Sequence, residues 1–270
     1  MFIRPRRLLD QVTLLHGPQD LLGRYFIAAD NYARERGVRL RLRTDFEELI
    51  ALNARHRDSW PALAPVFNPE LSNLRIDTAF WIDATDEEGE TVATHAARFF
   101  DWPETTLATE LRSLRPFYED PAPRIAAGES AECDAPAANF IRGRVMYGGA
   151  VWVRPDWRQR GLASLIPRIS RAYGYTRWNT HYTWALIEPR THELGLARAN
   201  GPYRVEERVV LNLGFRGHLP LLLMWMPREA MLEDIADIVD QATVDSSRRM
   251  ETLSTNSSPL PVRQGMSRRS

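Results

Sequence analysis

The spacing of apolar residues changes several times along this chain, and that change limits the available folds more than any other feature. Residues 38–43 alternate apolar and charged side chains with a period of two, as a half-buried strand does. Residues 21–32 instead place apolar side chains on one helical face, and Gly37 stands where such a helix would stop. Strand and helix patterns mixed in this way predict an α/β (α+β) fold with a mixed, mostly antiparallel central sheet flanked by helices.

The same periodicities divide the chain into elements. Further strands are predicted at 78–83, 91–100, 139–153, 182–187, 203–213 and 219–226. Helices are predicted to begin at Thr44, near Asp101–Glu104, at Gly161 and near residue 190, and a loop is predicted at 119–138. The predicted organisation is a helical extension over 1–37, one domain over 38–227, a terminal helix over 228–244 and a disordered tail over 245–270.

Composition excludes several classes of chemistry. All 35 basic residues are arginine and they balance 35 acidic residues, so a lysine nucleophile, a Schiff base and a P-loop are excluded. Cys133 is the only cysteine in the sequence, which excludes an internal disulfide and a cysteine zinc cluster. The longest apolar run, Leu221–Met226, is too short to span a bilayer. We therefore expect a soluble, cytoplasmic protein with no metal and no membrane partner.

The most informative stretch is the junction of a strand and a helix at Val151–Ser164, which reads VWVRPDWRQRGLAS. The first turn of a helix leaves backbone N–H groups unpaired and carries the positive end of the helix dipole. Gly161 would let an anion approach that backbone closely. The stretch therefore predicts an anion-binding site, and one that suits two phosphates better than one carboxylate.

Charge is distributed unevenly around this junction. Between Asn139 and Ile187 the sequence has eight arginines and a single acid, Asp156. The compensating acids lie in residues 83–90 and 229–240. Such a local excess of positive charge can steer a polyanionic ligand toward the segment, and it is also typical of a solvated basic helix face.

The junction resembles the pyrophosphate loop of the GNAT superfamily of acyl-CoA N-acyltransferases, written R/Q-x-x-G-x-G/A. Here the loop reads Arg158-Gln159-Arg160-Gly161-Leu162-Ala163, and the lead-in, residues 151–157, is similar to that family's strand-to-loop entry. The resemblance implies that the fourth predicted strand, 139–153, splays from the fifth, 182–187. It further implies that acetyl-CoA binds the main chain of Val151 and Val153, and that its pyrophosphate is wrapped by Arg158, Gln159, Arg160, Gly161, Leu162, Ala163 and Ser164.

The activity implied by this resemblance is acetyl-CoA-dependent N-acyltransfer to a small-molecule or peptide amine. Two of the family's usual groups are missing here. Gly149 stands where many members carry a glutamate base, and residues 197–199 stand where many carry a tyrosine that protonates the leaving thiolate. Since the amine needs only to be neutral and aligned with the thioester, positioning alone can supply most of the acceleration.

Three residues are candidates for the missing proton transfers. Glu188 follows the strand 182–187 and should lie near the splay, where its carboxylate could accept an amine proton; a solvated strand end is the alternative. His192 titrates in a useful range, but a histidine in a turn is more often a cap or a surface group. Tyr203 could donate to a thiolate, although it occupies the place of the family's aromatic core residue.

Two other functions stay open at this point. Without the usual base and acid, the chain can be a catalytically degenerate GNAT-like acyl-CoA-binding module. The second is a nucleic-acid-binding protein that uses the arginine-rich segment; the neutral chain and the lack of a recognition-helix motif argue against it, and we expect no nucleic-acid partner. The acceptor, the acyl length and the oligomeric state do not follow from the sequence.

Overall fold

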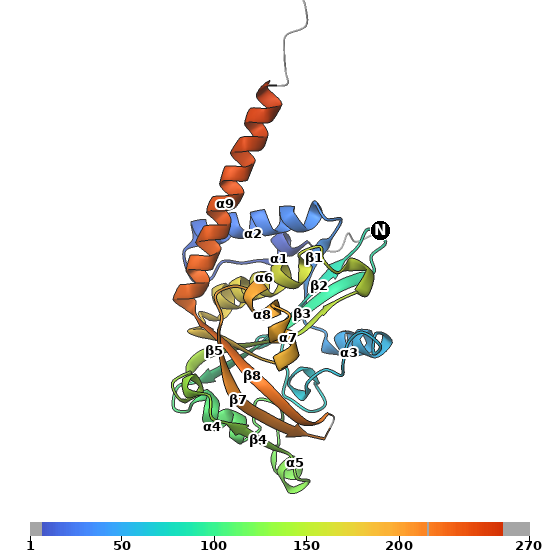
Figure 1. The fold of residues 1–270 in the computed structure, drawn as a ribbon, viewed down its shortest axis with the longest axis vertical. Coiled ribbons are helices and arrows are strands. Elements are labelled where there is room, and N and C mark those ends of the chain that lie inside the picture. The colour runs from blue at the N-terminus through green and yellow to red at the C-terminus, as the bar shows by residue number, and fades with distance from the viewer. Residues whose placement is uncertain (1–6, 215, 256–270) are drawn as a thin grey trace, which may run out of the picture.

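One sheet of eight strands organises the computed structural model, which describes residues 7–214 and 216–255 (Figure 1). The strands lie in the order β1-β2-β3-β5-β6-β8-β7-β4. Neighbouring strands pair antiparallel except β5 and β6, which are parallel. The predicted mixed, mostly antiparallel sheet flanked by helices is therefore confirmed.

The bounds of the elements are as follows. The strands are β1 (Arg39–Arg43), β2 (Ala79–Thr85), β3 (Thr91–Trp102), β4 (Ser130–Cys133), β5 (Gly143–Val153), β6 (Tyr182–Ile187), β7 (Arg204–Leu213) and β8 (Gly217–Pro227). The helices are α1 (Leu8–Gln11), α2 (Gln19–Arg34), α3 (Phe46–Arg55), α4 (Leu107–Arg112), α5 (Ala122–Ala126), α6 (Leu162–Trp178), α7 (Pro189–Glu193), α8 (Leu196–Ala199) and α9 (Arg228–Thr255). Short 3-10 helices lie at Pro65–Phe67 (η1), Pro136–Asn139 (η2) and Pro155–Trp157 (η3).

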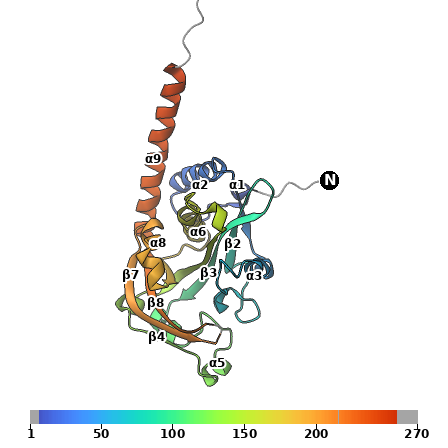
Figure 2. The same ribbon diagram turned by 45° about the vertical axis from the view of Figure 1, so that its right-hand side comes forward.

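Helices cover both faces of the sheet and enclose two apolar layers (Figures 1 and 2). The α6 layer lies beneath α2, α6 and α9, and includes Phe26 and Ile166. The α3 layer lies beneath α3, η1 and α4, and includes Leu49 and Phe67. Successive residues of a strand point to opposite faces, so β5 contributes to both layers. The far end of α9 projects away from the body of the molecule (Figure 2).

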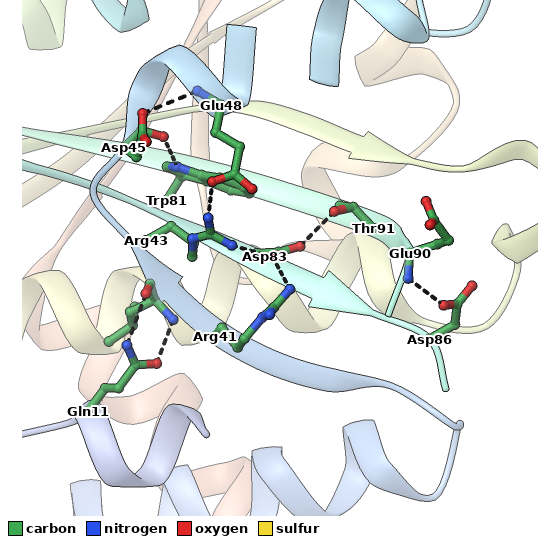
Figure 3. A network of polar contacts seen from close by, with 11 residues as sticks. Gln11, Arg41, Arg43, Asp45, Glu48, Trp81, Asp83, Asp86, Glu90 and Thr91 are labelled. Atoms are coloured by element: carbon green, nitrogen blue, oxygen red, sulfur yellow. Dashed lines mark hydrogen bonds and ion pairs between the residues drawn. The ribbon is translucent and has the colours of Figure 1, made fainter. Parts of the chain in front are cut away.

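The free edge of the sheet at β1 is closed by a side chain. The Gln11 amide accepts a hydrogen bond from the Leu42 N–H at 2.9 Å and donates one to the Leu42 carbonyl at 3.0 Å (Figure 3). A neighbouring strand would make the same pair of bonds. The segment before α2 therefore protects an edge that would otherwise be open to pairing with another chain.

A buried carboxylate ties the first three strands together. Asp83 of β2 is 1% exposed and accepts hydrogen bonds from Arg41 at 2.6 Å and from Arg43 at 3.3 Å, both on β1 (Figure 3). Its other oxygen accepts from the Thr91 hydroxyl on β3 at 2.9 Å. Because a buried charge without its partners is costly, this triad of Asp83, Arg41 and Arg43 disfavours any slip in the register of β1.

The predicted loop at 119–138 is wrong, because this segment contains α5, β4 and η2. β4 pairs with β7, with Ala131 opposite Leu211. Its four residues are too few to show a period of two, and they form a strand because β7 would otherwise be an unpaired edge. The added strand also buries Cys133, which the sequence placed in a loop.

Several helix boundaries also differ from prediction. The N-cap of α3 is Asp45 rather than Thr44, and its carboxylate accepts from the Glu48 N–H at 3.2 Å. The N-cap of α4 is Thr106, since β3 continues to Trp102 and includes residues expected to start the helix. The helix predicted to begin near residue 190 is followed by a second one, so that α7 and α8 are separated at Gly195, which has a φ of +78°.

The terminal helix is longer than predicted. α9 continues to Thr255, so the predicted disordered tail is wrong over residues 245–255. This segment contains no glycine or proline, and nothing in it ends a helix. The rest of the predicted tail, residues 256–270, lies outside the described residues.

Candidate functional site

β5 and β6 part from one another in the middle of the sheet. Their parallel pairing covers residues 145–147 of β5 and 182–184 of β6. Beyond these pairs, β5 stays bonded to β3 and β6 stays bonded to β8. The predicted splay between the fourth and fifth strands is confirmed, and these strands are numbered β5 and β6 because β4 is additional.

A bulge in β5 lies beside this gap. The pairing of β3 with β5 shifts between Thr94 and Ala96, and Ala150 has a φ of +52°. An extra residue in one strand bends it and breaks the regular ladder. The bulge therefore marks the point at which β5 turns away from β6.

The main chain of β5 beyond the bulge faces the gap. The Arg154 N–H donates to the Val92 carbonyl at 2.8 Å. Because ladder bonds alternate along an antiparallel pair, the main-chain groups of Val153 point away from β3. Val151 is 43% exposed and lines the cavity described next. Val153 is not among the residues that line that cavity.

A cavity of about 440 Å³ occupies the space between the parted strands. Its wall comes from β5 and β6, the first turns of α6, the segment from α7 to Tyr203, and the β7–β8 hairpin. On the α6 side the wall includes Ala163 and Pro167. Clefts of this size between secondary-structure elements are typical small-molecule sites.

The turn between β5 and α6 presents unpaired amide groups. The N–H groups of Gln159, Arg160, Gly161, Leu162 and Ala163 donate no hydrogen bond within the described part of the chain. Gly161 is the N-cap of α6 with a φ of +78°, and Gln159 has a φ of +64°. Successive N–H groups in such a turn, at the positive end of a 17-residue helix, form a concave anion site.

The side chains of this loop have different surroundings. Arg158 and Arg160 are exposed, whereas Leu162 is buried at the start of the helix. The Ser164 hydroxyl donates to the Ala199 carbonyl at 2.6 Å and accepts from Arg168. Since the Ser164 N–H bonds Gly161 as well, Ser164 connects α6 to α8 and has no free donor for a ligand.

The N-terminal helix α2 reaches the same loop. The Tyr32 hydroxyl lies 2.8 Å from the position that a Cβ would occupy on Gly161. Arg36 donates to the Arg160 carbonyl at 3.1 Å, and its guanidinium lies over the Tyr32 ring at 3.2 Å from the centroid. The helical extension therefore supports the anion loop, which the sequence motif did not indicate.

The space beside Gly149 is filled by aromatic rings. A Cβ on Gly149 would lie 2.9 Å from Cε2 of Phe67 and 3.3 Å from Cε1 of Tyr147. The two rings are themselves in contact, with centroids 5.6 Å apart. A side chain at position 149 would therefore have to displace the aromatic rings of the α3 layer.

Glu188 directly follows β6, is the N-cap of α7 and lines the cavity. Its Oε1 accepts from Arg216 at 2.6 Å, and Arg216 lines the cavity too. The Glu188 side chain is 44% exposed, so its carboxylate is accessible to water. His192 is exposed on α7 and is not among the cavity residues, whereas its neighbour Thr191 on the same helix lines the cavity. The structure therefore brings Glu188 to the site and leaves His192 outside it.

Tyr203 lines the cavity, with its ring packed in the core and its hydroxyl group in a polar contact. Its ring packs against the α6 layer, and its hydroxyl accepts from Arg171 at 3.3 Å. Arg171 is 1% exposed, donates to the Asn200 carbonyl at 2.5 Å and lies 3.7 Å from Asp234 of α9. A buried cation thus holds the Tyr203 hydroxyl at the cavity wall.

Two further residues, His95 and Tyr147, line the cavity, and no sequence pattern predicts that they do. His95, beside the bulge, is 4% exposed, and its Nδ1 has no hydrogen-bond partner among the described residues. Burial, and then the charge of Arg171, lower the pKa of His95 to about 3, so the imidazole is neutral at physiological pH. Burial raises the pKa of Tyr147, which keeps its hydroxyl protonated. Strand periodicity places both residues in a sheet but cannot reveal that a cavity reaches them.

The fold is thus a mixed α/β sheet that splits beside a strand–helix turn with unpaired amide groups. No family model matches the chain, and no curated protein matches it. Among solved structures, it is similar to NAA60 of Arabidopsis thaliana in complex with acetyl-CoA, with 14% identity over 71% of this chain and 99% of that chain and a TM-score of 0.44.

Two other solved structures are similar at the same level. The aminoglycoside acetyltransferase AAC(6')-Ib in complex with coenzyme A and kanamycin has 14% identity over 72% of this chain and 96% of that chain, with a TM-score of 0.40. The spermidine N-acetyltransferase of Vibrio cholerae in complex with CoA and spermine has 14% identity over 72% and 98%, with a TM-score of 0.39. Likenesses this distant do not establish a family.

Over residues 7–214 and 216–255, none of the helices combines the length and apolar character needed to cross a membrane. Within the same ranges, no three histidine, cysteine, aspartate or glutamate side chains are grouped so that they could hold a metal ion.

Proposed function

We propose that the protein is an acetyl-CoA-dependent N-acyltransferase of the GNAT type. The observation that carries the proposal is the continuity between the anion turn and the gap beside it: Ala163 belongs to the run of unpaired amides and also lines the cavity between β5 and β6. One strand–turn–helix unit can thus hold a diphosphate at the helix start and a linear arm along β5. The far part of the cavity is left for a second substrate.

In this proposal the main chain supplies most of the contacts to acetyl-CoA. The amides of residues 159–163 bind the pyrophosphate, and the exposed Arg158 and Arg160 add positive charge beside it. The main chain of Val151 and the N–H of Val153 bind the amides of the pantetheine arm, whereas the Val153 carbonyl accepts from the Arg158 side chain at 3.4 Å. Leu162 and Ser164 act indirectly, the first by anchoring the helix start and the second by joining α6 to α8.

The acyl-CoA provides an activated thioester, and the protein aligns an amine with it. The amine nitrogen attacks the thioester carbon, a C–N bond forms, the C–S bond breaks and the thiolate leaves. We assign Glu188 to take the amine proton, directly or through water, and Tyr203 to donate a proton to the thiolate, because both line the cavity. His192 has no role in this scheme, because it lies outside the cavity.

A binding module without catalysis is the second candidate function. It is favoured by the aromatic packing at Gly149, where the usual base would have to displace the aromatic rings. The two candidates differ in one measurement, the release of free CoA thiol from acetyl-CoA. Release that depends on an added amine supports the enzyme, whereas slow hydrolysis that is independent of amines supports the module.

Calorimetric titration with CoA tests the binding site that both candidates share. We expect saturable binding to the wild-type protein and none to Gly161→Glu, which places a carboxylate at the anion turn. Gly89→Glu is the matched control, since Gly89 also has a positive φ, +89°, with nothing within 4 Å of its Cβ position. Absence of heat with the wild-type protein at about 1 mM CoA would remove the proposal.

A further inference from the structure

The cavity wall carries very little charge. Among the described residues that line it, Glu188 is the one acid and Arg216 the one arginine. These two side chains form an ion pair at 2.6 Å, so their charges offset each other. The imidazole of His95 also lines the cavity and is neutral. The wall as a whole therefore offers no uncompensated negative charge.

The part of the wall on the α3 layer is apolar. It belongs to the α3 layer, whereas α6 packs in the other apolar layer. Its side chains come from the segment before η1, from the segment after α4 and from the β7–β8 hairpin, and they include Ala64, Phe117, Leu211, Leu213, Leu219 and Leu221. Since acyl-CoA enters from the anion turn at α6, this apolar wall faces the second substrate.

An acceptor with several ammonium groups fits such a wall poorly. Each ammonium that leaves water without a counter-charge costs free energy that apolar contacts do not return. One ammonium can be accommodated, because Glu188 takes its proton as the reaction begins. An apolar body gains by leaving water for a surface formed by Phe117 and the leucines.

We propose that the acceptor is a primary amine with a single positive charge and an apolar, aliphatic or aromatic body, and that polyamines and aminoglycosides are excluded. This inference rests on the proposed function, because it assigns the apolar half of the cavity to the acceptor. It adds the chemical class of the substrate, which the anion turn and the splay do not provide.

The test uses phenethylamine as the apolar monoamine and spermidine and kanamycin as polycations. Each is titrated calorimetrically into the full-length protein with saturating CoA, and each is also assayed for thiol release from acetyl-CoA. We expect phenethylamine to bind at least about tenfold more tightly than either polycation, and its kcat/KM to exceed theirs by a similar factor. Equal or tighter binding of a polycation, or no phenethylamine binding at about 10 mM, overturns the inference.

The titration with CoA alone separates this result from failure of the proposed function. If CoA binds and phenethylamine does not, the proposed acyl-CoA site is supported and the proposed class of acceptor is wrong. If CoA does not bind, the proposed function fails and the acceptor class fails with it.

A charge placed in the apolar wall gives a second test. Leu219→Glu should reduce phenethylamine affinity and raise spermidine affinity, lowering the ratio of the two by at least about tenfold. His218→Glu adds the same charge at the neighbouring exposed position and should leave the ratio unchanged. If thermal unfolding shows that Leu219→Glu does not fold, Arg216→Gln replaces it, because it frees the Glu188 carboxylate and should also shift the ratio toward spermidine. An unchanged ratio in the folded variant contradicts the inference.

Discussion

The hydroxyl oxygen of Tyr32 lies 2.8 Å from the position that a β-carbon would occupy on Gly161. Tyr32 belongs to α2, before the first strand, whereas Gly161 begins α6. The turn with the unpaired amides is thus held in shape by a helix far away in the sequence. Any side chain at position 161 meets both this hydroxyl and an unfavourable backbone conformation, because the φ of Gly161 is +78°.

Gly161→Ala should therefore weaken CoA binding by at least about tenfold, since it strains the turn by roughly 1–2 kcal/mol and displaces Tyr32. The clash with the Tyr32 hydroxyl can be separated from the backbone strain by also replacing Tyr32 with phenylalanine. In Tyr32→Phe the atoms nearest the new methyl group are ring carbons at 3.7 Å, an ordinary contact distance. Calorimetry on Gly161→Ala with and without Tyr32→Phe should show partial recovery in the double variant. Recovery to wild-type affinity would contradict a backbone contribution.

Glu188→Gln should lower kcat by about 100-fold or more, because the amide cannot accept the amine proton. The rate that remains should rise with pH toward the pKa of the acceptor amine, since the variant depends on amine that is already neutral. Initial rates measured with the fastest amine over a range of pH check this. Glu193→Gln is the control, because Glu193 is an exposed carboxylate on the adjacent α7. An equal loss in both variants would show a general effect of charge and no specific role for Glu188.

The buried imidazole of His95 makes stability depend on pH. Its pKa is near 6.5 in the unfolded chain and about 3 in the folded protein, so below pH 6.5 the unfolded chain takes up a proton that the folded protein does not. The free energy of unfolding should fall as the pH drops from 6.5 toward 3, by up to about 1.4 kcal/mol per pH unit. Urea unfolding from pH 7.5 to 5 measures this slope. His95→Gln should have a shallower slope, and identical slopes would show that His95 does not contribute.

Removing the Asp83 carboxylate should destabilise the β1 edge. Asp83→Asn leaves Arg41 and Arg43 without their shared partner, at a cost of about 2–4 kcal/mol, since both arginines keep part of their hydration. Thermal and urea unfolding measure the loss. Asp77→Asn provides the comparison, because the Arg75–Asp77 pair is exposed and should contribute nothing measurable. Similar losses in the two variants would contradict a special role for the buried triad.

Much of the fold follows from apolar periodicity. β6 occupies the predicted residues 182–187, because an apolar run ends there at the charged Glu188. β4 could not be predicted, since residues 130–133 form a strand only in the presence of the β7 edge. The extent of α9 was missed because residues 245–255 lack the apolar pattern on which the prediction relied, although their helix propensity is adequate.

Part of the candidate site could likewise be predicted from the sequence, and part could not. The anion turn was predictable because its strand, arginines and glycine are contiguous in the sequence. Glu188 reaches the cavity because it directly follows a predicted strand, whereas placing His192 required knowing which face of α7 meets the cavity. His95 and Tyr32 could not be found, because their positions depend on contacts with β5 and α6 that are distant along the chain.

The parallel join between β5 and β6 is three residue pairs long, and the rest of the sheet divides into two antiparallel halves on either side of it. The sheet thus consists of two antiparallel halves, here called plates, and the three β5–β6 pairs between them are the seam. A ligand lodged beside that seam touches both plates, so its occupancy and the integrity of the whole sheet are thermodynamically linked. A ligand bound there stabilises the folded protein against unfolding. At concentrations well above its Kd, the melting temperature should rise in proportion to the logarithm of the ligand concentration.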